Sequence, residues 1–159
     1  RRYLLNAQLN GDTLEMAGGN NNLGSCFYSI GKYDSAEVYH LHALKLAYQI
    51  DAAYATGNAL QNLGNTYQKT EKAADAMDYY MRALAIYREV NSAVGIMETN
   101  TNLGGLLARN DRGKEAIPYL TEALGLAREK SETRLEVDIL KYLYSYSSFE
   151  YQLATGYSF

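Results

Sequence analysis

The chain has 159 residues, of which 47% are hydrophobic and 21% are charged, a composition typical of a folded domain. Its net charge of −3 at pH 7 argues against direct nucleic-acid binding, which needs basic surface to displace counterions. No apolar run approaches the roughly 20 residues that span a bilayer. The single cysteine, Cys26, excludes an internal disulfide. The compartment stays open, with the cytoplasm favoured because disulfides are rare there.

A 40-residue repeat dominates the sequence. The triplet Asn-Leu-Gly at residues 22–24 returns at 62–64 and again at 102–104. An Ala-Leu pair at residues 43–44 returns at 83–84 and 123–124 in the same register. A fixed period in this range indicates a stacked array of repeats. Such arrays offer an extended surface to a partner.

Each repeat is predicted to contain two helices, which we call helix A and helix B. Leu60, Leu63, Gly64 and Tyr67 follow the i, i+3, i+4, i+7 spacing of one helical face, and a polar break at residues 69–72 precedes the next helical pattern. The expected helices are 13–30, 33–50, 52–69, 73–90, 92–109 and 113–130. The residues expected to cap the N-termini of helices A are Asp51, Asn91 and Ser131, whose side chains suit that role.

The repeats define one domain with incomplete ends, which we expect to be part of a longer protein. The expected divisions are 1–11, the tail of a preceding helix B; 12–50, repeat 1; 51–90, repeat 2; 91–130, repeat 3; and 131–159, a partial fourth repeat or capping helix. Residues 144–159 form either a lengthened helix or a frayed end, and the helix is favoured.

Small residues recur where the two helices of a repeat should cross. Close approach of two helices requires small side chains at the contact. We expect helix A to provide Gly24, Gly64 and Gly104 and helix B to provide Ala36, Ala76 and Ala116. Glycine costs about 1 kcal/mol inside a helix, so three glycines in register imply a compensating gain in packing. Tyr39 and its counterparts 40 and 80 residues later are predicted to pack between helices.

These landmarks resemble the tetratricopeptide repeat. The motif in the first repeat is Leu23-Gly24, Phe27, Gly31, Ala36 and Ala43-Leu44. The usual repeat has 34 residues; the longer period here is similar to the repeats of kinesin light chains, of Leu-Gly-Asn-type adaptors and of bacterial sensor and regulator arrays. The resemblance implies an all-α, right-handed superhelical solenoid of antiparallel helix pairs, with about seven helices. It also implies that helices A line a concave face that binds a protein or peptide.

Polar residues on helices A are the candidate peptide-binding site. The helical periodicity of 100° per residue places them away from the side that carries Leu23 and Phe27. The candidates are Asn22, Ser25, Tyr28, Ser29, Asn58, Asn62, Asn65, Lys69, Glu98, Asn102 and Arg109. Amides both donate and accept hydrogen bonds, so Asn22, Asn62 and Asn102 could hold the backbone of an extended peptide. Alternatively, these asparagines satisfy neighbouring protein groups or water. The mixed charges favour a polar, moderately charged peptide.

The sequence predicts no catalytic residues, metal site or cofactor. His40 and His42 are the only histidines, and a two-residue separation on a helix points their side chains about 200° apart. His40 occupies the position that holds Tyr80 and Leu120 in the later repeats, which favours a packing role. No glycine-rich phosphate loop follows a strand.

Three functional hypotheses therefore follow. The first is a module that binds an extended protein or peptide segment through helices A. The second is a ligand-responsive sensor or regulatory module of a bacterial signalling protein. The third is an architectural array that self-associates through its ends, because exposed apolar patches favour association.

Overall fold

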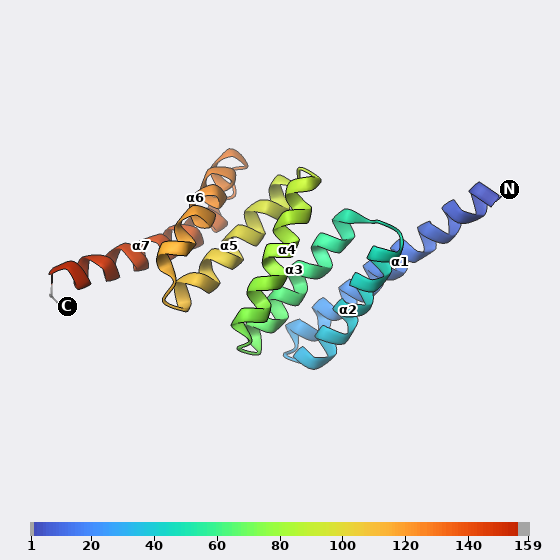
Figure 1. The fold of residues 1–159 in the computed structure, drawn as a ribbon, viewed down its shortest axis with the longest axis horizontal. Coiled ribbons are helices and arrows are strands. Elements are labelled where there is room, and N and C mark those ends of the chain that lie inside the picture. Colours follow the sequence, from blue (N-terminus) through green and yellow to red (C-terminus); the bar gives the residue numbers. More distant parts are fainter. Residues whose placement is uncertain (1, 156–159) are drawn as a thin grey trace. The chain divides into compact units, whose positions relative to one another are not determined.

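The computed structural model describes the backbone of residues 2–155 and the side chains of residues 9 and 11–145. Within residues 2–155 it contains helices and turns and no strand (Figure 1). The helices are α1 (Arg2–Ser29), α2 (Tyr33–Gln49), α3 (Ala53–Lys69), α4 (Ala73–Glu89), α5 (Ala93–Arg109), α6 (Gly113–Glu129) and α7 (Thr133–Thr155). The predicted all-α architecture of paired helices is confirmed for these residues.

The chain divides into two compact units, residues 1–95 and 96–159. In the first unit, α1 packs against α2, α3 packs against α4, and α2 also packs against α3. Helices α1 and α3 touch directly as well, so the two helices A lie side by side. The N-terminal part of α1 extends beyond α2 (Figure 1).

In the second unit, α6 packs against α7. Helix α5 approaches α6 at Gly104, where Leu120 fills the space that a side chain would need, and it approaches α7 at Gly105 beside Tyr142. Each of these contacts places a glycine of α5 against a large side chain of another helix. The second unit therefore packs glycines of a helix A against large side chains of neighbouring helices.

The turns between helices share one backbone geometry. In each turn one residue takes a positive φ, and these residues follow one another every 20 positions. They are Gly31, Asp51, Glu71, Asn91, Asp111 and Ser131, with φ of 76°, 52°, 61°, 53°, 58° and 59°. The residue after each donates its N–H to a carbonyl five positions back, as Ala52 does to Ala47 at 3.0 Å. This is the hydrogen bond that closes a helix C-terminus around a left-handed residue.

The prediction that Asp51, Asn91 and Ser131 are N-caps was therefore wrong. These residues end the preceding helix in a left-handed conformation, which Asn and Asp adopt more readily than other side chains. The N-cap of α3 is Ala52, which makes no side-chain capping bond. At α5 the Ser92 hydroxyl accepts the Gly95 N–H at 3.2 Å, one residue after the predicted cap.

The two ends of the chain are longer helices than the repeat requires. Residues 2–11 form the first part of α1, whereas the sequence predicted that they were the tail of a separate preceding helix. At the other end α7 runs to Thr155, which agrees with the favoured helical alternative for residues 144–155. Residues 156–159 lie outside the described part. The assignment of the chain to individual repeats stays a prediction.

Candidate functional site

The candidate site lies on helices A. Where helix B crosses helix A it covers one side of helix A, and the candidate residues must lie on a side that helix B leaves uncovered. A Cβ atom on Gly64 would lie 2.6 Å from the ring of Tyr80, and one on Gly24 would lie 2.5 Å from the ring of His40. The corresponding alanines of helices B are buried: Ala36, Ala76 and Ala116. The predicted packing of small residues at the crossings is thus confirmed.

Aromatic side chains join the same helix pairs. The rings of Phe27 and Tyr39 stack with centroids 5.2 Å apart, and those of Tyr67 and Tyr79 stack at 5.1 Å. This confirms the packing role predicted for Tyr39 and its counterpart Tyr79. The Tyr67 hydroxyl donates to Glu37 of α2 at 2.6 Å. Burial and the Glu37 carboxylate raise the pKa of Tyr67.

Asn21 is the centre of a polar cluster that the sequence analysis missed. Its Oδ1 accepts a hydrogen bond from Asn62 Nδ2 at 3.0 Å and lies 3.0 Å from His40 Nδ1. An amide oxygen only accepts, so Nδ1 of His40 carries the proton and donates. The cluster links α1, α2 and α3. A sequence signal existed, since the equivalent positions 61 and 101 also hold polar residues.

His40 is buried and stays neutral near pH 7. Its removal from water lowers its pKa from 6.5 to about 4, because burial penalises the charged form. His42 is exposed on the same helix. The structure thus confirms the packing role predicted for His40. Within the described residues, no group of three or more His, Cys, Asp or Glu side chains could hold a metal ion.

The asparagines predicted to form a ladder differ in their surroundings. Asn22 is exposed, whereas Asn62 and Asn102 are half-buried. Asn62 donates one amide N–H to Asn21. For this N–H the alternative hypothesis applies, in which the asparagines satisfy neighbouring protein groups. Its second N–H and its Oδ1 have no partner among the described residues. Asn102 also has an interaction with the protein.

Other candidates on α1 and α3 mostly bind their own surroundings. Asn58 accepts the Tyr87 hydroxyl at 2.6 Å, and Asn65 accepts the Tyr80 hydroxyl at 2.7 Å. The hydroxyls of Ser25 and Ser29 each donate to the carbonyl four residues earlier: Ser25 to Asn21 and Ser29 to Ser25. Lys69 is exposed at the end of α3. Asn22 and Lys69 are therefore the candidates in this unit with the greatest freedom to meet a ligand.

Three further candidates complete the predicted set. Tyr28 is half-buried and packs edge-on against Tyr33 at 5.6 Å, and burial raises its pKa. In the second unit Glu98 is exposed. Arg109 donates to the Tyr142 hydroxyl at 2.9 Å and lies 5.7 Å from the centre of that ring. Arg109 is thus held against α7.

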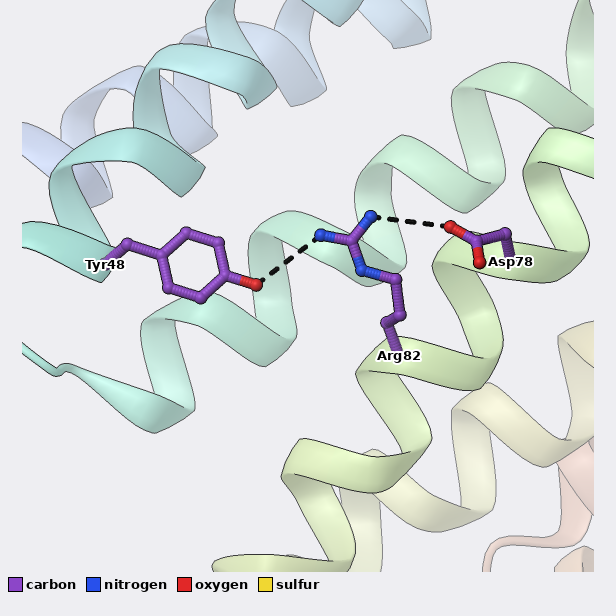
Figure 2. Close-up of polar contacts among 3 residues, drawn as sticks. All are labelled: Tyr48, Asp78 and Arg82. Atoms are coloured by element: carbon purple, nitrogen blue, oxygen red, sulfur yellow. Dashed lines mark hydrogen bonds and ion pairs between the residues drawn. The ribbon is translucent and has the colours of Figure 1, made fainter.

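Helices B carry a separate cluster outside the candidate site. Figure 2 shows Arg82 of α4 between Tyr48 of α2 and Asp78 of its own helix. The guanidinium lies 3.5 Å from the Tyr48 hydroxyl and 3.4 Å from the Asp78 carboxylate. All three side chains are largely exposed, so bonds of this length contribute little to stability. The cluster lies on α2 and α4, the two helices B of the first unit.

Comparisons with known proteins agree with this arrangement. Residues 15–89 match the sequence model of the tetratricopeptide repeat. The fold is similar to the tetratricopeptide repeat domain of FLU from Arabidopsis, with a TM-score of 0.68, 19% identity, and coverage of 75% of this chain and 98% of that one. It is also similar to aspartyl phosphate phosphatase F from Bacillus subtilis, with a TM-score of 0.76, 16% identity and 88% coverage of this chain.

The chain spans 38% of the length of that phosphatase. No curated protein matches the sequence. In the described part of the chain, no helix is both long and apolar enough to cross a membrane. The similarity to solved structures supports the fold alone. The sequence match supports the presence of the repeat motif. The sequence match to the tetratricopeptide repeat covers residues 15–89 of this chain.

Proposed function

We propose that the first unit binds an extended, polar peptide segment along the free side of α1 and α3. Tetratricopeptide repeats are typically non-catalytic modules that mediate protein–protein interactions, and the match of residues 15–89 to their sequence model supports such a role. The proposal also specifies the surface that contacts the peptide and the residues that make the contacts. It assigns backbone recognition to Asn22 and Asn62 and charge recognition to Lys69.

The observation that carries the proposal is the hydrogen bond from Asn62 Nδ2 to Asn21 Oδ1 at 3.0 Å. It joins α1 and α3 directly, which supports a polar surface that runs from one helix to the other. Helices α2 and α4 cover other sides of α1 and α3, at Gly24 and Gly64. A peptide laid along this surface would meet amides and a lysine.

The chemistry of this surface suits a peptide backbone. A half-buried amide that keeps one N–H and its oxygen free can donate to a peptide carbonyl and accept from a peptide N–H. The bond to Asn21 holds Asn62 in place, which lowers the side-chain entropy lost on binding. Lys69 adds one exposed cation at the end of α3, so an acidic residue near one end of the peptide is favoured.

The test is a selection from a peptide display library, followed by affinity measurements on the enriched peptides. The variant Asn22→Ala/Lys69→Ala removes two exposed side chains of the proposed surface and should weaken binding about tenfold or more, because charge-assisted hydrogen bonds contribute about 1.5–3 kcal/mol each. The matched control is Lys45→Ala/Gln49→Ala, which removes a lysine and an amide from the exposed side of α2.

Equal loss in both variants, or no loss in the first, would contradict the assignment. Asn62→Ala belongs to a separate series, because it also removes the bond to Asn21. We expect that variant to lose about 1 kcal/mol of unfolding free energy in addition to affinity, with its helical content unchanged by circular dichroism.

A further inference from the structure

The side-chain amide of Asn21 is bonded at its oxygen and unbonded at its nitrogen. Its Oδ1 lies 3.0 Å from His40 Nδ1 and 3.0 Å from Asn62 Nδ2, so two donors occupy the two lone pairs of this oxygen. Its Nδ2 has no hydrogen-bond partner among the side chains and backbone groups that the structure describes. Asn21 is half-buried, which leaves part of the amide open to a ligand.

The two donors fix the direction in which the Asn21 amide faces. If the amide were turned over, its own N–H groups would meet the donors of His40 and Asn62. The buried His40 ring would then lose its acceptor, and a buried donor without a partner is costly. Because the oxygen and the nitrogen leave the amide carbon in different directions, Nδ2 of Asn21 faces away from both neighbours.

His40 can hold Asn21 because its ring lies at the crossing of α1 and α2. A Cβ atom on Gly24 would lie 2.5 Å from this ring, so the ring packs directly on the backbone of α1. Asn21 lies three residues before Gly24, on the neighbouring turn of the same helix. Only 1% of His40 is exposed, so bulk water does not replace Asn21 as the acceptor. The contact is therefore built into the packing of the helix pair.

The α3–α4 pair uses its crossing residue differently. The counterpart of His40 in α4 is Tyr80. Its hydroxyl donates toward Asn65 and Gln68, which lie further along α3. The orientation of Asn21 by a buried ring is therefore a feature of the α1–α2 pair.

Asn21 and Asn62 bring N–H groups from two helices close together. Their two nitrogens are separated by one hydrogen bond and one amide group. The second N–H of Asn62 and both N–H groups of Asn21 have no partner among the described residues. N–H groups require an acceptor, and the acceptor that an extended peptide offers at every residue is its backbone carbonyl.

We propose that Asn21 is a further peptide-contacting residue, that its Nδ2 donates to a backbone carbonyl of the bound peptide, and that His40 is the positioning residue that orients this amide. The inference rests on the proposed binding of a peptide by α1 and α3. It adds the peptide group that is recognised where the two helices meet. His40 stays buried and acts only through Asn21.

The substitution Asn21→Asp separates the two ends of the amide. The carboxylate keeps an oxygen for His40 and Asn62 but replaces Nδ2 with a second oxygen, which repels a peptide carbonyl. For a peptide enriched by the display selection, we expect the affinity to fall about fivefold or more, with the urea midpoint at pH 7 close to that of the wild type. The matched control is Asn91→Asp, which makes the same charge change in an exposed turn, where Asp51 holds the equivalent position.

A double-mutant cycle with His40→Leu tests the positioning role. Leucine occupies the equivalent position in the third repeat, at residue 120. We expect His40→Leu alone to weaken peptide binding about threefold, because the released Asn21 amide must be ordered on binding. In the Asn21→Ala background it should have no further effect, since no amide remains to be oriented. Equal losses of affinity in both backgrounds would show that His40 has only a structural role.

The outcomes distinguish this inference from the proposed function. If Asn22→Ala/Lys69→Ala weakens peptide binding but Asn21→Asp binds like the wild type, the contact by Asn21 is wrong and peptide binding by α1 and α3 stands. If neither variant loses affinity, or if no peptide is enriched, both proposals fail.

The orientation of Asn21 is also testable without a peptide. Nitrogen-15 NMR of the His40 ring at pH 7 reports which ring nitrogen carries the proton. We expect the proton on Nδ1, as a donor to Asn21 Oδ1 requires. A proton on Nε2 alone would make Nδ1 an acceptor, reverse the Asn21 amide and overturn the inference.

Discussion

The α1–α2 and α3–α4 pairs carry the same repeat but differ in their surroundings. Leu63 is fully buried because α3 lies between two helices B, whereas its counterpart Leu23 is 48% exposed. The crossing within each pair is the same, with a glycine of helix A against a large side chain of helix B. The repeat sequence therefore determines the helix pair, while neighbouring repeats determine which outer sides are buried.

The side chains at the two crossings differ in chemistry. Tyr80 reaches past Gly64 and donates its hydroxyl toward Asn65 and Gln68, at 2.7 and 2.8 Å. His40 is shorter and hydrogen-bonds Asn21. The α1–α2 crossing thus contains an imidazole, whereas the α3–α4 crossing contains a phenol. We therefore expect the stability of the two helix pairs to respond differently to acid.

Filling a crossing should have the largest effect. In Gly64→Leu the new side chain meets the ring of Tyr80, whose nearest atoms would lie only 2.6 Å from a Cβ atom at residue 64. We expect a loss of about 3 kcal/mol or more in unfolding free energy, the upper range for overpacked cores. Urea denaturation measures it. The control is Gly18→Leu, where nothing lies within 4 Å; a similar loss in the control would contradict the crossing.

Acid should destabilise the α1–α2 pair through His40. The folded-state pKa is about 4 and the unfolded value 6.5, so the unfolded chain binds the proton first as pH falls. The stability from neutral, buried His40 is present above pH 6.5 and is lost as pH falls toward 4, by roughly 3 kcal/mol in total. Urea denaturation from pH 7 to 4 should show this loss in the wild type and a smaller loss in His40→Leu, which copies the residue at position 120. Equal pH dependence in both would contradict it.

A third comparison concerns positions 60 and 100, which are equivalent in the repeat. Leu60 and Asn100 are both fully buried, and Asn100 Nδ2 donates to Glu122 at 2.8 Å. The Asn100 Oδ1 has no hydrogen-bond partner in the described part of the chain, which costs about 1–3 kcal/mol. We expect Asn100→Leu to raise the unfolding free energy by about 1–2 kcal/mol, measured by thermal denaturation. A destabilised variant would show that the Glu122 bond outweighs that cost.

The smallest expected effect is in the turns. Gly31 and Glu71 are equivalent residues with φ of 76° and 61°, and side chains other than glycine pay about 1–2 kcal/mol in this region. Glu71→Gly should raise the unfolding free energy by about 1 kcal/mol, since the added chain entropy offsets part of the gain. Gly31→Glu should lower it. Opposite signs in chemical denaturation would show that the turn geometry does not control stability.

The sequence predicted the helices of the repeats closely. The bounds of α2 to α6 each differ from the prediction by one residue at one end, because apolar periodicity and turn positions recur every 40 residues. The caps were wrong because Asp and Asn favour both N-cap and left-handed positions. The Asn21 cluster was missed because its partners lie 19 and 41 residues away. Such contacts follow from helix packing and carry little local signal. The peptide-binding role of the helix A residues stays a prediction.

The most direct test of peptide binding by α1 and α3 is to map amide shifts by NMR while a selected peptide is added. We predict that the largest shifts fall on residues around Asn22, Asn62 and Lys69, and that the outer side of α2 and α4 around Tyr48 and Arg82 changes little. Shifts concentrated around Tyr48 and Arg82 would place the binding surface on helices B and contradict the account.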